Sequence, residues 1–290
     1  QCVASGSAAD LKSPVTGLTG GFLRRMVNGL QRPTKQWGEN GLAEGVFAGR
    51  TALVTGGGRG IGRALCRMLA ENGAKVAINY QGNVEAARET LAAIEVAGGE
   101  AMLARADVAS EQEVGRMVGD IRDRFGPVGL LVNNAGIATS DEHDEFGFEE
   151  WARMFAVNVD GPFLTTWAVK GEMITAGFGR IVNISSLAAH LLKPNMIHYA
   201  TTKAAVIAFT RHTAVALAEH NIRVNCLAPG LTDTDLARSG NPGMVQQLIA
   251  DTPLGRMGDP SEMAAAVKFL LSEESSFITG QTITACGGRS

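Results

Sequence analysis

The sequence predicts an α/β fold, in which a doubly wound parallel sheet forms a single domain with a helical N-terminal arm. From Thr51 onward, short β-branched runs alternate with longer stretches of helical periodicity, and this alternation is typical of βαβ units. A chain of 290 residues, 45% of them hydrophobic, can bury one large core, which favours one domain over two. The strand runs are TALVTG, KVAINY, AMLARADV, LLVNNAG, GRIVNISS, IRVNCLAPG and TGQTITACGG.

Residues 1–47 differ in kind from residues 48–290, which hold the predicted sheet. In the stretch LTGGFLRRMVNGLQ, helical spacing gathers the apolar residues on one face, opposite Arg24, Arg25 and Asn28. We interpret this amphipathic helix as an arm that packs on its own domain or on a partner subunit. A targeting helix or a membrane-surface contact is the alternative.

Composition excludes several classes of function. A formal net charge of -3 with scattered lysines and arginines does not favour nucleic acid as a partner. The four cysteines lie far apart without a histidine cluster, so we predict no disulfide framework, no metal site and a reduced cytoplasmic setting. Because no apolar run reaches about 18 residues, no membrane span is expected.

The first strand leads into a glycine-rich loop. TGGGRGIG, from Thr55 to Gly62, follows the strand and opens the helix GRALCRMLAENG. Glycines let a backbone turn tightly and approach a pyrophosphate, which then sits on unpaired N–H groups at the helix N-terminus. We therefore predict a Rossmann-type dinucleotide site here, formed by Gly56, Gly60, Ile61 and Gly62.

The end of the second strand indicates which dinucleotide is used. An acidic residue there would accept the ribose hydroxyls and repel a 2′-phosphate. The candidate positions in KVAINYQGN are Asn79, Tyr80 and Gln81, none of them acidic, while Arg59 in the glycine loop supplies a cation. We therefore predict NADP(H), with NAD(H) as the alternative. A solvated loop arginine is the competing interpretation of Arg59.

The third and fourth strands also end in candidate cofactor contacts. Asp107, followed by Val108, is placed to accept from an adenine amino group, although capping the next helix would be the ordinary role of such a carboxylate. The small residues of NNAG, which include Asn134, Ala135 and Gly136, allow close passage of a cofactor. A strand-terminating turn would explain NNAG equally well.

Taken together, these motifs resemble the short-chain dehydrogenase/reductase family. The resemblance covers roughly residues 48 to 288, with every motif in chain order. It rests on TGGGRGIG, NNAG, NVDG, IVNISS, YATTK and APG.

The resemblance implies four catalytic residues, Asn158, Ser186, Tyr199 and Lys203. Tyr199 stands at the position of the general acid and base, and Ser186, thirteen residues earlier, at that of the residue that holds the substrate oxygen. Lys203 lies one helical turn after Tyr199, where its charge favours the phenolate and its head can bind ribose. Asn158 corresponds to the residue that helps hold a water linking the lysine to solvent.

Further roles follow from the same resemblance. After Pro229 and Gly230, the stretch with Thr232 and Thr234 resembles the part that holds the nicotinamide carboxamide, and Thr234 also suits a helix cap. Substrate selection is expected from the loop between Ser186 and Tyr199 and from the stretch after Thr234. We interpret the loop histidines, His190 and His198, as hydrogen-bonded structural residues rather than catalytic ones.

The overall pattern is most similar to the 3-oxoacyl-carrier-protein reductases and related ketoreductases. Two positions that present arginines to the acidic carrier in those enzymes are Gly177 and His220 here, which argues against docking of a carrier. The run DEHDEFGFEE also gives no attraction to an acidic partner, and a solvated loop with a helix start is its competing interpretation. Cys286 replaces an aspartate common in relatives, in a segment that packs at a subunit interface in the family. A homotetramer is expected, with a dimer as the alternative.

The function predicted from the sequence is an NADP(H)-dependent oxidoreductase that transfers a hydride between nicotinamide and a small-molecule ketone or secondary alcohol. Reduction of a 3-oxoacyl carrier protein is the nearest alternative. A catalytically silent scaffold that binds cofactor without turnover is an alternative of another class, against which the complete Ser, Tyr, Lys and Asn set argues.

Overall fold

The computed structural model describes residues 45–238 and 241–289. Most of the arm predicted for residues 1–47 lies outside this part of the chain. Phe47 belongs to the described part, and its side chain is 2% exposed within the hydrophobic core. Its backbone N–H donates to the Asn72 carbonyl at 2.9 Å, so the globular domain already includes the residues just before the expected boundary at 48.

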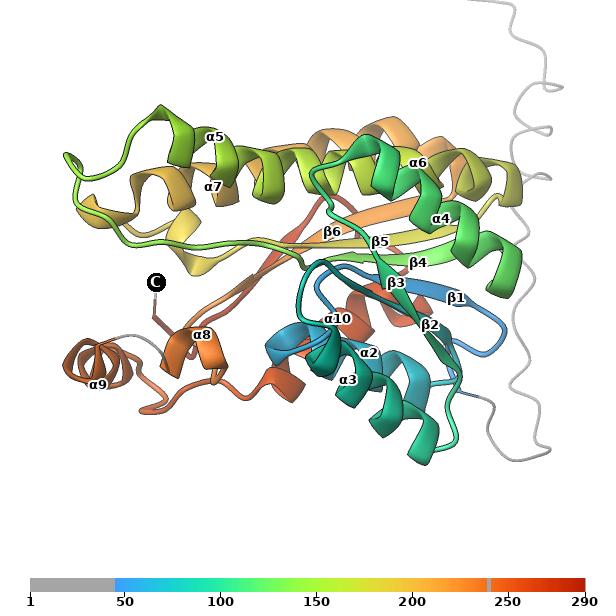
Figure 1. Ribbon diagram of the computed structural model, residues 1–290, viewed down its shortest axis with the longest axis horizontal. Coiled ribbons are helices and arrows are strands. Elements are labelled where there is room, and N and C mark those ends of the chain that lie inside the picture. The colour runs from blue at the N-terminus through green and yellow to red at the C-terminus, as the bar shows by residue number, and fades with distance from the viewer. Residues whose placement is uncertain (1–44, 239–240, 290) are drawn as a thin grey trace, which may run out of the picture. The chain divides into compact units, whose positions relative to one another are not determined.

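Seven parallel strands form one sheet in the described residues, in the order β3-β2-β1-β4-β5-β6-β7 (Figure 1). This arrangement confirms the predicted doubly wound, Rossmann-type fold. The strand order reverses between β1 and β4, and such a switch point opens a crevice at the carboxyl ends of the strands. The strands are β1 (Thr51–Val54), β2 (Lys75–Tyr80), β3 (Ala101–Arg105), β4 (Val128–Asn133), β5 (Gly179–Ile184), β6 (Ile222–Pro229) and β7 (Thr282–Ala285).

Helices cover both faces of the sheet (Figure 1). One core contains Leu65 and Leu69 of α2 (Gly60–Glu71), Ile94 of α3 (Val84–Val96) and Val267 of α10 (Pro260–Leu271). Because helices cover both faces of the sheet, every residue of β1, β5 and β6 is buried.

The second core lies on the opposite face of the sheet. Met117 of α4 (Glu111–Phe125), Val169 of α6 (Gly161–Ala176) and Leu217 of α7 (Ile197–Leu217) pack together there. The other α-helices of the described residues are α5 (Phe148–Phe155), α8 (Asp235–Arg238) and α9 (Pro242–Ala250), and a π-helical turn (Ala156–Asp160) joins α5 to α6. Short 3-10 turns are formed by Leu187–Ala189, Pro194–Met196, Ala218–His220 and Glu273–Ser275.

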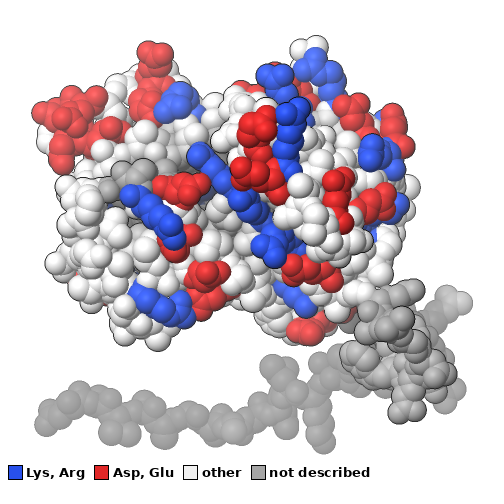
Figure 2. All heavy atoms as spheres, turned by 60° about the horizontal axis from the view of Figure 1, so that its bottom comes forward, with Lys and Arg blue, Asp and Glu red and all other residues white. Residues whose placement is uncertain are grey.

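Charges of both signs alternate on the face that carries α2, α3 and α10 (Figure 2). Several of them are paired, including Arg63 with Glu89 and Arg256 with Glu262, at 2.8 and 2.7 Å. Exposed pairs of this kind contribute little to stability, typically about 0–1 kcal/mol. Around α2, α3 and α10 the described residues therefore form no large patch of one sign, whereas acidic groups gather at the upper left of the view (Figure 2).

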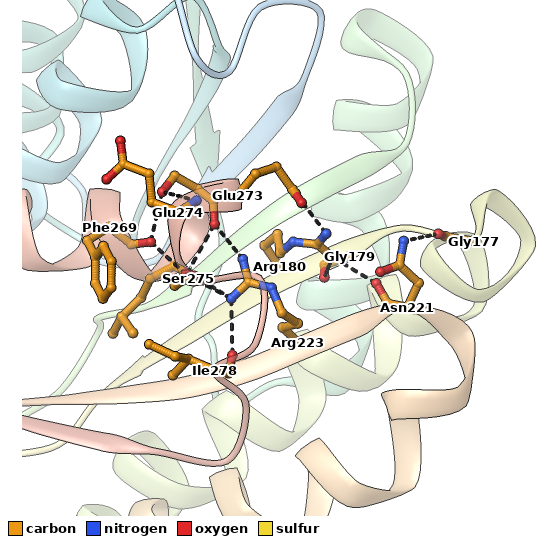
Figure 3. A network of polar contacts seen from close by, with 12 residues as sticks. Gly177, Gly179, Arg180, Asn221, Arg223, Phe269, Glu273, Glu274, Ser275 and Ile278 are labelled. Atoms are coloured by element: carbon orange, nitrogen blue, oxygen red, sulfur yellow. Dashed lines mark hydrogen bonds and ion pairs between the residues drawn. The ribbon is translucent and has the colours of Figure 1, made fainter. Parts of the chain in front are cut away.

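A buried polar network lies where β5 and β6 begin, at the end of the sheet away from the carboxyl ends of its strands (Figure 3). Arg180 and Arg223 are paired in register on these strands and are 3% and 7% exposed. Arg223 donates to the carbonyls of Leu270, Ser272 and Ile278. These bonds satisfy backbone groups at the end of α10, while Arg180 pairs with Glu273 at 2.8 Å. Burial, together with the neighbouring Arg180, lowers the pKa of Arg223 to about 10.

Candidate active site

A cavity of about 530 Å³ lies at the carboxyl ends of the strands, around the switch point. A volume of this size is typical of small-molecule and cofactor sites. Every residue predicted from the sequence to bind a dinucleotide lines it, and so does Ser186. The predicted set is Gly56, Arg59, Gly60, Ile61, Gly62, Asn79, Tyr80, Asp107, Val108, Asn134, Ala135, Gly136, Tyr199, Lys203, Pro229, Gly230, Thr232 and Thr234.

The glycine loop leads straight into the N-terminus of α2 at the cavity wall. A Cβ at Gly62 would overlap the Gly56 carbonyl oxygen, and one at Gly56 would lie 3.0 Å from the Ala135 Cα. Only glycine therefore allows this close approach. The cap residue of α2, Arg59, forms no side-chain cap bond, and the first turn holds no acidic residue. The helix thus presents N–H groups without a capping side chain to the cavity, which fits a pyrophosphate.

The residues predicted to select between NADP(H) and NAD(H) have different surroundings. Asn79 is 2% exposed, and its side chain accepts from the Gly56 N–H and donates to the carbonyls of Ala104 and Ala106. It holds the glycine loop in place and offers no free group to a ribose. Arg59 is exposed at the rim and forms no ion pair with another described residue. Tyr80 is half-buried at the end of the strand.

Asp107 and Asn134 line the cavity on the third and fourth strand ends. Asp107 accepts from Gln81 at 2.8 Å and from the Ala109 N–H at 2.9 Å, while Ser110 caps α4. Asn134 donates to the Thr55 and Gly56 carbonyls at 2.9 and 3.1 Å. The amide of Asn134 therefore joins the end of β4 to the glycine loop, and NNAG does more than terminate a strand.

Tyr199 and Lys203 lie one turn apart on α7, as their spacing predicts. Burial raises the pKa of the Tyr199 phenol, and a hydrogen bond with Ser186 opposes that effect. Lys203 is 5% exposed, its Nζ donates to the Ile184 carbonyl at 3.0 Å, and it lies 5.7 Å from the centre of the Tyr199 ring. Burial lowers the pKa of Lys203 to about 8. The pair therefore holds a protonated phenol beside an ammonium group of reduced pKa.

The two serines at the end of β5 are used differently. Ser185 is 3% exposed, and its hydroxyl donates to the Lys203 carbonyl at 2.7 Å. Ser186 is half-buried, accepts from the Ala188 N–H at 3.1 Å and is hydrogen-bonded with Tyr199 in the cavity lining. Only the second hydroxyl is thus available to a ligand, while the first anchors α7 to the sheet.

Asn158 lies behind the cavity wall rather than on it. It is fully buried in the π-helical turn, where its side chain accepts from the Ile137 N–H and donates to the Ile137 carbonyl, both at 2.9 Å. It also donates to Thr202, the neighbour of Lys203. A Cβ at Gly136 would meet both Asn158 Oδ1 and Lys203 Nζ, at 3.2 and 3.3 Å. Asn158 and Lys203 therefore converge on the same backbone segment.

His198, the residue before Tyr199, joins α7 to the loop after NNAG. Its ring is fully buried and stacks on Phe146 with 4.4 Å between ring centres. Nε2 lies 2.6 Å from Thr139 Oγ1 and 3.2 Å from an Asp141 carboxylate oxygen. These contacts hold one edge of the cavity opening against the helix that carries Tyr199, which agrees with the structural role predicted for this histidine.

Comparisons with known proteins agree with this geometry. A family model described as Enoyl-(Acyl carrier protein) reductase matches residues 56–290. The chain is 39% identical to a 3-oxoacyl-[acyl-carrier-protein] reductase from Synechocystis sp. over 240 residues, which are 82% of this chain and 96% of that protein. The chain belongs to the short-chain dehydrogenase/reductase family. It is therefore an enzyme of an oxidoreductase family, as the sequence motifs predict.

Solved structures of other short-chain dehydrogenases match the whole domain. A gluconate 5-dehydrogenase from Burkholderia cenocepacia, in complex with NADP and tartrate, is 38% identical with a TM-score of 0.79, covering 83% of this chain and 95% of that one. A 7α-hydroxysteroid dehydrogenase, complexed with NADH and 7-oxo glycochenodeoxycholic acid, is 35% identical with a TM-score of 0.81. This match covers 86% of this chain and 98% of the other.

Several residues that line the cavity were not predicted from the sequence. Asn83 and Asp235 contribute polar groups, while Ile137 and Val157 add apolar surface. Asn83 closely follows a strand that ends at the cavity, so its position was a usable signal. Ile137 directly follows NNAG and had the same positional signal, whereas Val157 comes from the π-helical turn and follows no strand end.

Two further classes of site are absent from the described residues. No helix among them is long and apolar enough to cross a membrane. No group of three or more His, Cys, Asp or Glu side chains there could hold a metal ion.

Proposed function

We propose that this short-chain dehydrogenase uses NADP(H) to interconvert a small-molecule ketone and a secondary alcohol. One observation supports the proposal above all: Ser186, Tyr199 and Lys203 meet in the same cavity as an uncapped helix N-terminus. Such a cavity can hold a dinucleotide and a carbonyl group side by side, next to a phenol that donates a proton.

The residues of the cavity fit a nicotinamide dinucleotide. The first turn of α2 would hold the pyrophosphate, and Lys203 would hold the nicotinamide ribose. Thr234 already accepts from the Ala237 N–H as a cap of α8, which positions the segment expected to hold the carboxamide. The bound cofactor would supply the hydride in reduction and accept it in oxidation.

Tyr199 is suited to give a proton to the substrate oxygen. Its raised pKa keeps the phenol protonated at neutral pH, as an acid for ketone reduction must be. Ser186 would donate a second hydrogen bond to the same oxygen as negative charge develops. In the direction of alcohol oxidation, the positive charge of Lys203 would lower the cost of forming the phenolate.

Asn158 supports this chemistry from its position behind the cavity wall. By bonding both backbone groups of Ile137, its side chain positions the segment that passes Lys203 Nζ. This placement suits the water relay between Lys203 and solvent that the family resemblance implies.

Arg59 supports the choice of NADP(H) over NAD(H). It is an exposed cation at the cavity rim, free of ion pairs to other described residues, and no carboxylate ends β2. A 2′-phosphate would find a partner there, and nothing on this strand end would repel it.

Reduction of a 3-oxoacyl carrier protein is the second candidate, favoured by the names of the relatives. The loop after β4 argues against it, because Glu142, Asp144 and Glu145 are exposed close behind Ala138, which lines the cavity. An acidic carrier would be repelled by these carboxylates. We therefore place a free carbonyl compound ahead of a carrier-bound one.

We also propose that the protein forms a homotetramer, in which α6 and α7 pair with their copies. Phe163 and Trp167 are 40% and 45% exposed, and their rings are tilted against each other with 4.4 Å between the ring centres. Phe209 of α7 lies 6.1 Å from the Trp167 ring. Exposed aromatic clusters of this kind are typical of interfaces.

The test is consumption of NADPH and NADH with a panel of ketones and a pantetheine-linked 3-oxoacyl thioester. We expect NADPH-dependent reduction of a free ketone, abolished by Tyr199→Phe, which retains the ring and loses only the acid. Faster turnover of the thioester, with further gain on an acidic carrier protein, would favour the second candidate. Tight cofactor binding without turnover of any carbonyl would instead indicate a catalytically silent scaffold.

A further inference from the structure

The Gly58 carbonyl, in the middle of the glycine loop, is held by two side chains that lie outside the cavity. It accepts hydrogen bonds from Arg63 Nε and Nη2, at 3.2 and 3.0 Å, and from the Thr90 hydroxyl at 3.0 Å. Gly58 and Arg59 line the cavity, whereas Arg63 and Thr90 do not. The Gly58 carbonyl therefore points away from the cavity, toward α2 and α3.

Arg63 belongs to α2, but its guanidinium is also bound to α3. Nη2 donates to the Ala86 carbonyl at 3.2 Å and pairs with the Glu89 carboxylate at 2.8 Å. Nε also donates to the hydroxyl of Thr90, which is fully buried, at 3.1 Å. One planar group with several donors thus joins the glycine loop to both helices, and a lysine could not form the same set of bonds.

The bonded carbonyl also determines the direction of the next N–H group. The carbonyl of Gly58 and the N–H of Arg59 belong to one trans peptide plane, in which they point in opposite directions. Because the carbonyl is held toward α2 and α3, the Arg59 N–H is turned toward the cavity, beside the N–H groups of the first turn of α2. The orientation of this peptide also determines where the Arg59 side chain leaves the backbone.

We propose that Arg63 is a positioning residue for the dinucleotide and acts through the peptide between Gly58 and Arg59. The inference rests on the proposed function, because it requires the cofactor to bind at the start of α2. With the Gly58 carbonyl held by Arg63, the Arg59 N–H adds a donor for the pyrophosphate. Without these bonds the peptide can rotate and turn a carbonyl oxygen toward the phosphates, which would weaken binding.

The first test measures the dissociation constants of NADPH and NADH by fluorescence titration, without turnover. Arg63→Met retains a long side chain but loses the donors, so both constants should rise by about 10- to 100-fold, as expected for lost hydrogen bonds from a charged group. Arg67→Met is the matched control, because Arg67 lies one turn further along α2, is exposed and pairs with Glu71 at 3.7 Å. It should bind both dinucleotides as tightly as the wild type. Unchanged constants in Arg63→Met would overturn the proposal.

The second test separates the bonds to Gly58 from the ion pair with Glu89. Glu89→Gln removes the ion pair and leaves the bonds from Arg63 to the Gly58 carbonyl, so the affinity for NADPH should stay close to that of the wild type. Arg63→Lys retains the cation but not the planar donors, and its affinity should lie between those of the wild type and Arg63→Met. A loss in Glu89→Gln as large as that in Arg63→Met would assign the effect to the ion pair and overturn the proposal.

The third test separates positioning of the cofactor from a general loss of structure. In Arg63→Met, KM for NADPH should rise while kcat at saturating NADPH stays at the wild-type value, because Ser186, Tyr199 and Lys203 lie on other elements. Hydrogen exchange of residues 55–62 in the cofactor-free protein should accelerate in Arg63→Met and not in Arg67→Met. A fall in kcat without a rise in KM, or unchanged exchange in this loop, would overturn the proposal.

The binding measurements also distinguish failure of this inference from failure of the proposed function. Weaker NADPH binding by Arg63→Met, in a protein that reduces no ketone, would refute the proposed function and support the role of Arg63. Turnover of a ketone with equal NADPH affinity in the wild type and Arg63→Met would support the proposed function and refute the role of Arg63. A wild-type protein that binds neither dinucleotide would refute both.

Discussion

Replacing Lys203 by methionine should stabilise the protein at neutral pH. The pKa of Lys203 is lowered by burial from 10.5 to about 8, so the fold disfavours its charge by about 2.5 pH units. At about 1.4 kcal/mol per unit, this corresponds to a cost on the order of 3 kcal/mol. Loss of the bond to the Ile184 carbonyl offsets about 1–2 kcal/mol of the gain. A net increase of about 1–2 kcal/mol in the free energy of unfolding is therefore expected at pH 7.

The sign of the pH dependence follows from linkage. Below pH 8 both folded and unfolded states hold the Lys203 proton, and the cost is fully present. Between pH 8 and 10.5 the unfolded state binds more protons, so the stability contributed by this site rises with pH. The advantage of Lys203→Met should consequently shrink by about 2 kcal/mol between pH 7 and about pH 9.5.

Guanidinium unfolding of the cofactor-free protein at several pH values measures this difference. Groups that titrate in both proteins contribute equally to the two free energies of unfolding, so their contributions cancel in the difference. Lys268→Met, at a half-buried position on α10, is the matched control and should follow the pH dependence of the wild type. Parallel curves for Lys203→Met and the wild type from pH 7 to 9.5 would refute the reasoning about its burial.

Three other predictions concern the cavity and the buried network. Arg59→Ala should lower the ratio of kcat/KM for NADPH to kcat/KM for NADH by about 10- to 100-fold, which is the effect expected from loss of one contact between a cation and a phosphate. An unchanged ratio would mean that the 2′-phosphate binds elsewhere. His198→Phe retains the stacking on Phe146 but loses the contacts of Nε2, so amide hydrogen exchange should accelerate in residues 137–147, with partial recovery in His198→Gln. Arg223→Lys cannot reach all the carbonyls at the end of α10, and thermal unfolding should show a loss of about 3 kcal/mol. A Tm within about 1 °C of the wild type would contradict that role.

Much of the site could be predicted because its determinants are local. Tyr199 and Lys203 are four residues apart in a helical stretch, and helix geometry alone places them on one face. The carboxyl ends of parallel strands lie along one edge of the sheet. Residues that directly follow the strands therefore gather at this edge, and their position does not depend on how individual side chains pack. The family resemblance then distinguished Ser186 from Ser185, and the structure shows the Ser185 hydroxyl donating to the Lys203 backbone carbonyl.

Other features depend on contacts between distant segments. Asn79 stands where a cofactor ligand is expected, but its side chain is already hydrogen-bonded to the Gly56 N–H and to the Ala104 carbonyl. The hydrogen-bond partner of His198, Thr139, lies about sixty residues away in the sequence. By itself the sequence determined the sheet, the strand-end loops and the spacing of the reacting groups, because these follow from backbone geometry over a few residues. Only the tertiary structure decided which polar side chains stay free, because each hydrogen bond depends on what packing brings within about 3 Å.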